Sequence, residues 1–157
     1  MNDVANNIVA FMLNKEELSA KSATFIYDWI KTDGKEKTKV MYNIWDSVLR
    51  IYLPTERPVI FRACSRISKR EIQSFTGRIR CAEKFSDGHK GHLLICDTAE
   101  YLYYEDNINS SPPYEHSFFP VYDLIRKNLK CPTPQFTQNF YDQYKCEDEY
   151  ILRVNIN

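Results

Sequence analysis

Two glutamates stand two residues apart near the C-terminal end of the chain, in the segment Glu147-Asp148-Glu149. Residues 150–154 follow directly and are rich in the β-branched and aromatic residues typical of a strand. Residues two apart in a strand share a face, so both carboxylates are expected on one side. One carboxylate could stabilise an oxocarbenium-like centre while the other handles an incoming nucleophile. Taken alone, the pattern is more typical of an acidic edge that discourages strand pairing.

Two further segments carry polar groups at positions that suit ligand binding. Arg62 leaves the short apolar run at residues 59–61, and its planar fork of donors suits bidentate binding of a phosphate. In Ser74-Phe75-Thr76 the two hydroxyl residues alternate along a strand and point the same way. They could orient a polar ligand or a catalytic carboxylate. Taken alone, Arg62 is better explained as a paired surface arginine, and the second segment as a strand edge with a helix N-cap.

The elements that must position these residues fall into two groups. Over residues 3–50, apolar residues recur at helical spacing in three runs, which predicts a small helical lobe. After a turn at residues 54–58, strands are expected at residues 59–62, 74–76, 91–96, 101–104 and 150–154, with helices at 78–86 and 121–129. Residues 131–146 are expected to form a loop. Helices followed by strands indicate an α+β fold in a single domain of 157 residues.

The order of the three segments along the chain favours a functional interpretation over the structural ones given above. Arginine on a first strand, Ser-x-Thr on a second and Glu-x-Glu on a last resembles the mono-ADP-ribosyltransferase superfamily. The resemblance covers roughly residues 55–157, and the helical lobe before the first strand also looks like that family's layout. It implies two small sheets packed face to face, with residues 1–53 as a helical lobe and residues 54–157 as an NAD⁺-binding core. The implied reaction cleaves NAD⁺ and transfers ADP-ribose to a protein side chain.

The resemblance also implies a role for each matched residue. Arg62 would hold the NAD⁺ phosphates, and Ser74 would contact NAD⁺ and position the catalytic glutamate. Thr76 would support the same strand, and the segment they share, Phe75 included, would line the cofactor site. Glu149 would be the catalytic glutamate and stabilise the oxocarbenium ion. Glu147 would engage the acceptor, for which arginine is favoured.

Two parts of this assignment stay open. The loop before the two glutamates would contact the acceptor protein, with Phe140, Tyr141 and Tyr144 as candidate aromatic contacts. Glu115 in Tyr114-Glu115-His116 is a second candidate for the catalytic glutamate, if the strand after Pro113 is the catalytic one.

Composition limits the partners, metal sites and cellular locations that are expected for this chain. The chain has 21 basic and 21 acidic residues, so nucleic acid is not an expected partner. Five cysteines without C-x-x-C spacing argue against a disulfide framework and a zinc site, and His89 and His92 are interpreted as a polar turn. No apolar run could span a bilayer, and the N-terminus lacks a signal-peptide layout. We expect a metal-independent, cytoplasmic protein, in the producing cell or in one that receives it.

Two alternatives differ from a transferase. A related enzyme could only hydrolyse NAD⁺ and label no protein. A non-enzymatic interaction or immunity protein could use the aromatic-rich segment 131–150 as a contact surface. By analogy with other small stand-alone domains of this type, the transferase would be a bacterial effector or toxin, or a phage enzyme.

Overall fold

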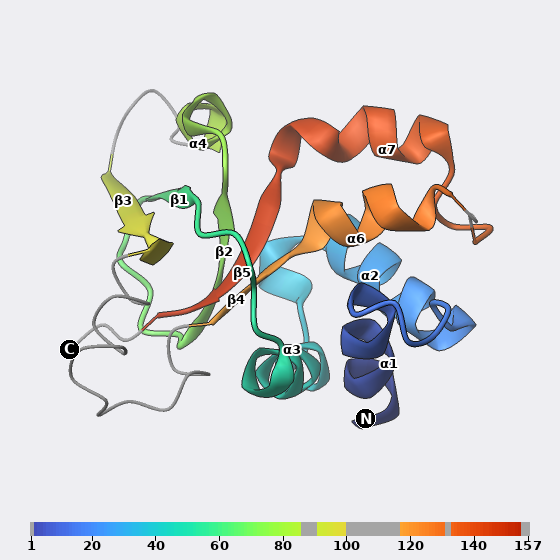
Figure 1. Cartoon of the computed structure of the whole chain (residues 1–157). Helices are drawn as coiled ribbons and strands as arrows, with labels where there is room; N and C mark the ends of the chain where they lie inside the picture. Colours follow the sequence, from blue (N-terminus) through green and yellow to red (C-terminus); the bar gives the residue numbers. More distant parts are fainter. Residues whose placement is uncertain (1, 86–90, 100–116, 131–132, 155–157) are drawn as a thin grey trace.

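The computed structural model of the chain describes residues 2–85, 91–99, 117–130 and 133–154 (Figure 1). Helices and an antiparallel sheet are both present, which confirms the α+β expectation. The strand predicted at 101–104, and the candidates His89 and Glu115, lie outside the described residues.

The N-terminal lobe is helical, as the apolar periodicity predicts. Its elements are α1 (Asn2–Met12), α2 (Ala20–Lys31), the short 3₁₀ helix η1 (Gly34–Glu36) and α3 (Lys39–Ile51). Hydroxyl caps set the starts of two of them: the Ser19 side chain accepts the Ser22 amide at 3.1 Å and Thr38 accepts the Met41 amide at 3.4 Å. The lobe buries Trp29 and Trp45 against each other, so it packs around large aromatic side chains.

Within the described residues, five strands form one antiparallel sheet in the order β3-β1-β2-β5-β4. They are β1 (Val59–Cys64), β2 (Ile72–Thr76), β3 (His92–Asp97), β4 (Phe118–Pro120) and β5 (Glu149–Arg153). Arg62 lies on β1 and Ser-Phe-Thr on β2, as expected, and Glu149 is the first residue of β5. Glu147 lies before that strand, at the end of the 3₁₀ helix η3 (Lys145–Glu147), so the expectation that both glutamates share one face of a strand is wrong. The left-handed turn at Asp148 between them breaks the strand alternation.

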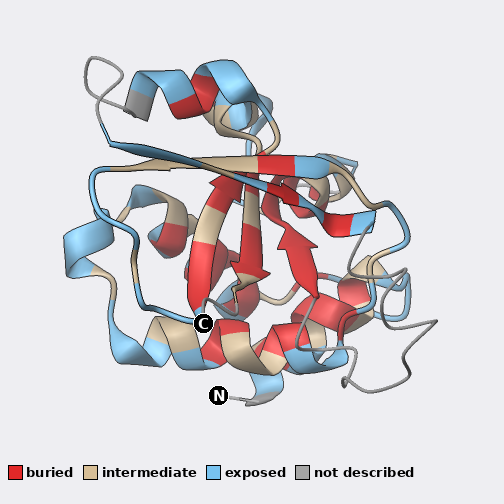
Figure 2. Ribbon diagram, turned by 90° about the vertical axis from the view of Figure 1, so that its left-hand side faces the viewer, coloured by how far each residue is buried: buried red, intermediate tan, exposed pale blue. Residues whose placement is uncertain are grey.

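The expectation of two separate sheets needs correction for the described residues. Strands β1 and β2 share a single registered pair, Phe61↔Thr76, whereas β1 and β3 share six pairs and β2 and β5 share five. Figure 2 shows β1 and β3 crossing over the other three strands. The pair Phe61↔Thr76 joins a β3-β1 half and a β2-β5-β4 half into one sheet. Away from that pair the two halves diverge.

The other helices in the described part of the chain are α4 (Ile79–Phe85), α6 (Val121–Asn128), α7 (Gln138–Tyr144) and the 3₁₀ helix η3 (Lys145–Glu147). Helix α7 and η3 lie in the segment that the sequence interpretation takes as a loop, so that expectation is wrong. Thr137 caps α7 by accepting the Phe140 amide at 3.1 Å, and Phe140 packs on Phe136 and Tyr144. This helix has seven residues, too short for an apolar period to be recognised in the sequence.

Two hydrophobic clusters lie on opposite faces of β2, β5 and β4. The larger one packs the helices against Ile72, Phe119 and Ile151. The smaller one lies between these strands and the β3-β1 half, and consists of Ile60, Phe75, Cys96, Phe118 and Leu152. Because side chains alternate along a strand, Phe118 and Phe119 enter different clusters. The three strands between the clusters are therefore mostly buried, as their colour in Figure 2 shows.

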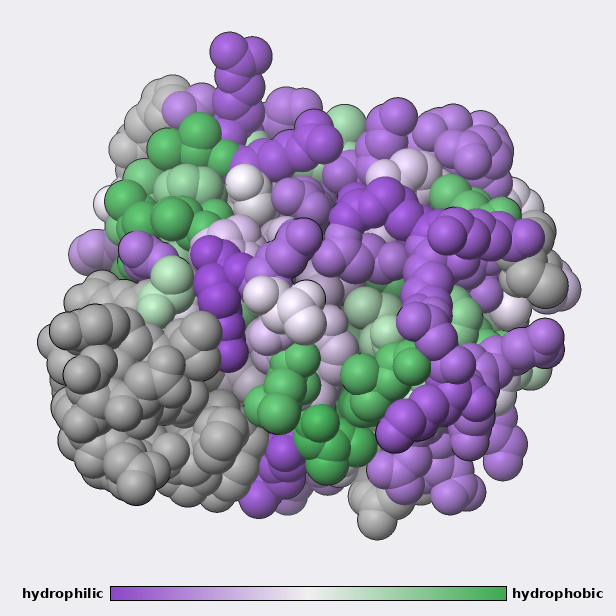
Figure 3. Space-filling model, in the orientation of Figure 1, coloured by the Kyte–Doolittle hydropathy of each residue, from purple (hydrophilic) through white to green (hydrophobic). Residues whose placement is uncertain are grey.

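The outer surface is mainly polar. Figure 3 shows hydrophilic side chains over most of one face, with hydrophobic side chains in separate patches. Leu53 and Ile95 are the most exposed large hydrophobic residues described, each 63% exposed. No helix among the described residues is long and apolar enough to cross a membrane.

Candidate functional site

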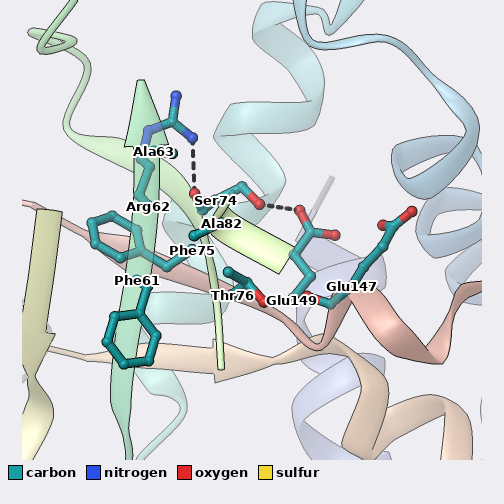
Figure 4. Close-up of a pocket in the computed structure, with 9 residues that line it drawn as sticks. All are labelled: Phe61, Arg62, Ala63, Ser74, Phe75, Thr76, Ala82, Glu147 and Glu149. Atoms are coloured by element: carbon teal, nitrogen blue, oxygen red, sulfur yellow. Dashed lines mark hydrogen bonds between the residues drawn. The ribbon is translucent and has the colours of Figure 1, made fainter. Parts of the chain in front are cut away.

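A pocket opens where strands β1 and β2 diverge (Figure 4). Its volume is about 280 Å³. The residues that line it come from β1, β2, α4 and the start of β5: Phe61, Arg62, Ala63, Ser74, Phe75, Thr76, Ala82, Glu147 and Glu149. All six residues that the sequence singles out for catalysis and cofactor binding therefore lie around one cavity, although they are up to 87 positions apart in the chain.

The Glu149 side chain is buried and held by two donors. The Ser74 hydroxyl donates a 2.5 Å hydrogen bond to Glu149 Oε2, and the Trp29 indole Nε1–H donates to the same oxygen at 3.0 Å. Thr76 pairs with Glu149 across strands β2 and β5. Ser74, two residues before Thr76, lies on the same face of β2. Ser74 therefore contacts Glu149 directly, and its role in positioning a catalytic glutamate stays a prediction.

Sequence reasoning missed Trp29. Its position in an apolar helical repeat indicates a core residue, and it is indeed 1% exposed on α2. Its ring does pack in the core, but its N–H points to a carboxylate 120 positions away. The sequence indicates only that a buried tryptophan needs a hydrogen-bond acceptor for its N–H. It does not identify the residue that accepts.

Glu147 occupies a different environment from Glu149. It is half-buried at the end of η3, and Tyr122 donates from its hydroxyl to Glu147 Oε2 at 3.3 Å. Burial, together with the neighbouring charge of Glu149, raises the pKa of the Glu147 carboxyl above its ordinary value. Burial and the Glu147 charge likewise raise the pKa of Tyr122, so this phenol stays a donor at neutral pH.

A tight turn separates the two glutamates. Asp148 adopts the left-handed conformation with φ 41° and ψ 54°, which turns the chain from η3 into β5. The Gly77 amide donates to the Asp148 carbonyl at 2.9 Å, and a Cβ at Gly77 would lie 2.2 Å from Asp148 Oδ2. A side chain at residue 77 would therefore require the Asp148 carboxylate to move, because the turn that separates the two glutamates packs directly against Gly77.

Arg62 lines the pocket from β1 with unused donors. Its Nη1 donates to the Ser74 carbonyl at 2.8 Å. Its Nε is buried and has no hydrogen-bond partner among the described residues, and no carboxylate of those residues forms an ion pair with it. The interpretation of Arg62 as a paired surface arginine is therefore not supported within the described part of the chain. A guanidinium left partly unsatisfied at a pocket wall suits an anionic ligand.

Lys37 adds a second cation close to the two glutamates. Its Nζ lies 3.7 Å from the centre of the Trp29 ring. Burial lowers the pKa of the Lys37 ammonium, while the charges of Glu149 and Glu147 partly offset that effect. The electrostatic field in the pocket therefore has contributions from two carboxylates and two cations. These are Glu147, Glu149, Lys37 and Arg62.

Phe75 and Thr76 have mainly structural contacts. Phe75 belongs to the smaller hydrophobic cluster. Thr76 Oγ1 donates to the Glu147 carbonyl at 2.6 Å and accepts the Arg78 amide at 3.1 Å. Thr76 therefore ties β2 to the turn that carries the glutamates, in agreement with the supporting role expected for it.

The three aromatic residues proposed to contact an acceptor lie on α7, outside the pocket. Phe140 is buried against Tyr27, Phe136 and Tyr144, so its expected role as a surface contact is wrong. Tyr144 and Tyr141 are half-buried, and their hydroxyls accept hydrogen bonds from Lys31 at 2.9 Å and Arg126 at 3.4 Å. Acceptor recognition by Tyr141 and Tyr144 stays a prediction.

The described residues contain no group of three or more histidine, cysteine or acidic side chains placed to hold a metal ion. His92 is exposed on β3. Comparisons of the chain with protein families, with curated proteins and with solved structures find no match.

Proposed function

We propose that this chain is an NAD⁺-dependent mono-ADP-ribosyltransferase, with a protein side chain, arginine favoured, as the acceptor. The observation that supports the proposal best is the meeting of Arg62, Ser74 and Glu149 at one pocket, with the Ser74 hydroxyl bonded to the Glu149 carboxylate. These residues come from three strands, β1, β2 and β5, and they are the residues to which the motif resemblance points. In the proposed enzyme the β3-β1 half and the β2-β5-β4 half serve as the two-sheet core of that superfamily.

The roles follow from the chemistry of the groups. Arg62 holds a phosphate of NAD⁺ with the outer nitrogens of its guanidinium, of which only Nη1 donates to another described residue. The bond between the nicotinamide nitrogen and the ribose C1′ breaks, its electron pair leaves with nicotinamide, and positive charge develops on the ribose ring. Glu149 stabilises that charge. The acceptor nitrogen then bonds to C1′ and loses a proton, which Glu147 accepts.

The dimensions of the pocket fit part of the dinucleotide. A volume of about 280 Å³ lies just below the roughly 300–1,000 Å³ usual for ligand pockets. We expect the nicotinamide ribose to enter the pocket, and the adenosine end to lie along the open surface beside β1.

The test is incubation of the protein with labelled NAD⁺ and cell lysate, beside Glu149→Gln. Glutamine keeps an oxygen that can accept from Ser74 and Trp29, so we expect the variant to fold. The expected result is label transfer to protein that falls by about 100-fold or more in Glu149→Gln. Glu36→Gln, which removes an exposed carboxylate from the lobe, should retain full activity.

Three outcomes contradict parts of the proposal. Equal labelling by wild type and Glu149→Gln rejects Glu149 as the catalytic glutamate. Release of nicotinamide without labelled protein indicates an NAD⁺ glycohydrolase. Absence of NAD⁺ binding and turnover rejects the enzyme and favours an interaction protein.

A further inference from the structure

Trp29 contacts Glu149 from the helical lobe, outside the three segments of the motif. Its indole N–H lies 3.0 Å from Glu149 Oε2, the same oxygen that accepts from Ser74. Glu149 Oε1 accepts no hydrogen bond from the described residues. Two donors on Oε2 therefore restrain rotation of the carboxylate and leave Oε1 as the oxygen available to a ligand.

The Trp29 ring is itself held on several sides. Tyr42 and Trp45 meet it edge to face, with ring centres 5.4 Å and 5.7 Å away, and the Lys37 ammonium lies 3.7 Å from its centre. A side chain packed in this way has one accessible rotamer, so its N–H direction is set before any ligand binds. The ammonium also brings positive charge close to the donor of the bond to Glu149.

We infer that Trp29 is a positioning residue, which fixes the orientation of the Glu149 carboxylate and so couples the helical lobe to the chemistry of the pocket. The kinetic consequence of this inference rests on the proposed function. Trp29 itself does not line the pocket, so it acts through Glu149. An oriented carboxylate matters most when charge develops on the ribose, so its loss lowers kcat more than it changes KM for NAD⁺.

The chain supplies a matched control. Trp45 is buried in the same lobe and packs against Trp29, but its Nε1 has no hydrogen-bond partner among the described residues. Trp29→Phe and Trp45→Phe therefore remove similar volume from the same core. Phenylalanine at position 45 keeps an aromatic ring beside Trp29, and only the first variant removes the bond to Glu149. We expect Trp29→Phe to lower kcat for nicotinamide release by about tenfold or more with KM changed less than about twofold. Trp45→Phe should stay within about threefold of wild type in both constants.

Equal losses of kcat in the two variants would overturn the inference, because they would show a packing role alone. So would a Trp29→Phe defect confined to KM. Thermal unfolding of both variants shows whether their stability losses match, as the similar volumes predict.

A second measurement needs no turnover of NAD⁺. The indole N–H resonance of Trp29, assigned by its loss in Trp29→Phe, should move upfield in Glu149→Gln because a charged acceptor becomes neutral. The Trp45 resonance should move far less. An unmoved Trp29 resonance would show that the bond to Glu149 is absent and would reject the inference. If wild type does not cleave NAD⁺, the proposed function fails, and this resonance still decides whether Trp29 holds Glu149.

Discussion

The two halves of the sheet differ in how completely their polar groups are satisfied. Strands β2, β5 and β4 lie between two hydrophobic clusters, and Glu149 there has two donors within 3.0 Å. Strands β1 and β3 are less buried among the described residues, and β3 exposes Leu93 and Ile95. Arg62 on β1 keeps a buried donor without a partner in the described part of the chain.

This difference indicates that the two halves would have different roles at one site. The packed half presents a carboxylate whose orientation is already set, which is the requirement for electrostatic stabilisation of a developing charge. The other half presents donors that a ligand would complete. The two halves are joined by the single registered pair, by the hydrogen bond from Arg62 to the Ser74 carbonyl and by the smaller hydrophobic cluster.

The first way to test the comparison uses neighbouring residues of β4. Phe119 lies in the larger cluster, against Trp45 and Tyr52, whereas Phe118 lies in the smaller one, and both are at most 1% exposed. We expect Phe119→Ala to lower the free energy of unfolding by about 3–5 kcal/mol, and Phe118→Ala by clearly less, because a small cluster collapses more easily onto a cavity. Urea denaturation of both variants measures this. An equal or larger loss for Phe118→Ala would show that the smaller cluster does not collapse more easily than the larger one.

The second test concerns the unsatisfied side of the pocket. Arg62→Lys keeps the charge and removes the planar fork, so we expect the Kd for NAD⁺ to rise about ten- to a hundredfold, with the thermal midpoint changed by only a few degrees. Equilibrium dialysis measures the binding, and Arg66→Lys, at an exposed arginine just after β1, is the control. Unchanged binding in Arg62→Lys would remove Arg62 from the ligand site.

The smallest expected effect concerns Glu147. Its pKa is raised by burial and by the charge of Glu149, so the folded chain binds this proton more tightly than the unfolded chain. The contribution to stability is therefore present at acid pH and is lost as pH rises from the ordinary value of 4.5 through the raised one. Glu147→Gln removes this dependence. Relative to wild type, its stability should increase as pH rises towards neutrality, by less than about 1 kcal/mol because the group is partly solvated.

Thermal unfolding of wild type and Glu147→Gln across this pH range checks the sign. The exposed Glu36→Gln variant controls for loss of one negative charge. A stability difference between wild type and Glu147→Gln that does not change with pH would contradict the burial argument.

Much of the architecture could be predicted from local patterns. The three helices of the lobe, the strand around Arg62, the strand of Ser74 and the last strand all appear where apolar periodicity and β propensity place them. The errors fall where local signal is weak. Helix α7 has only seven residues, and the joining of the two sheet halves depends on the one pair Phe61↔Thr76. Neither has a pattern long enough to be recognised in the sequence.

By itself, the sequence determined which residues could meet. Strand alternation placed Ser74 and Thr76 on one face, and the order of the segments identified Arg62 and the two glutamates. Only the tertiary structure decided how they meet, because hydrogen bonds across 75 and 120 positions depend on strand register and helix packing. It made Glu149 the doubly held carboxylate, and it raised the pKa of Glu147 through burial. It also brought Trp29 to the site from a helix that the sequence marks only as core.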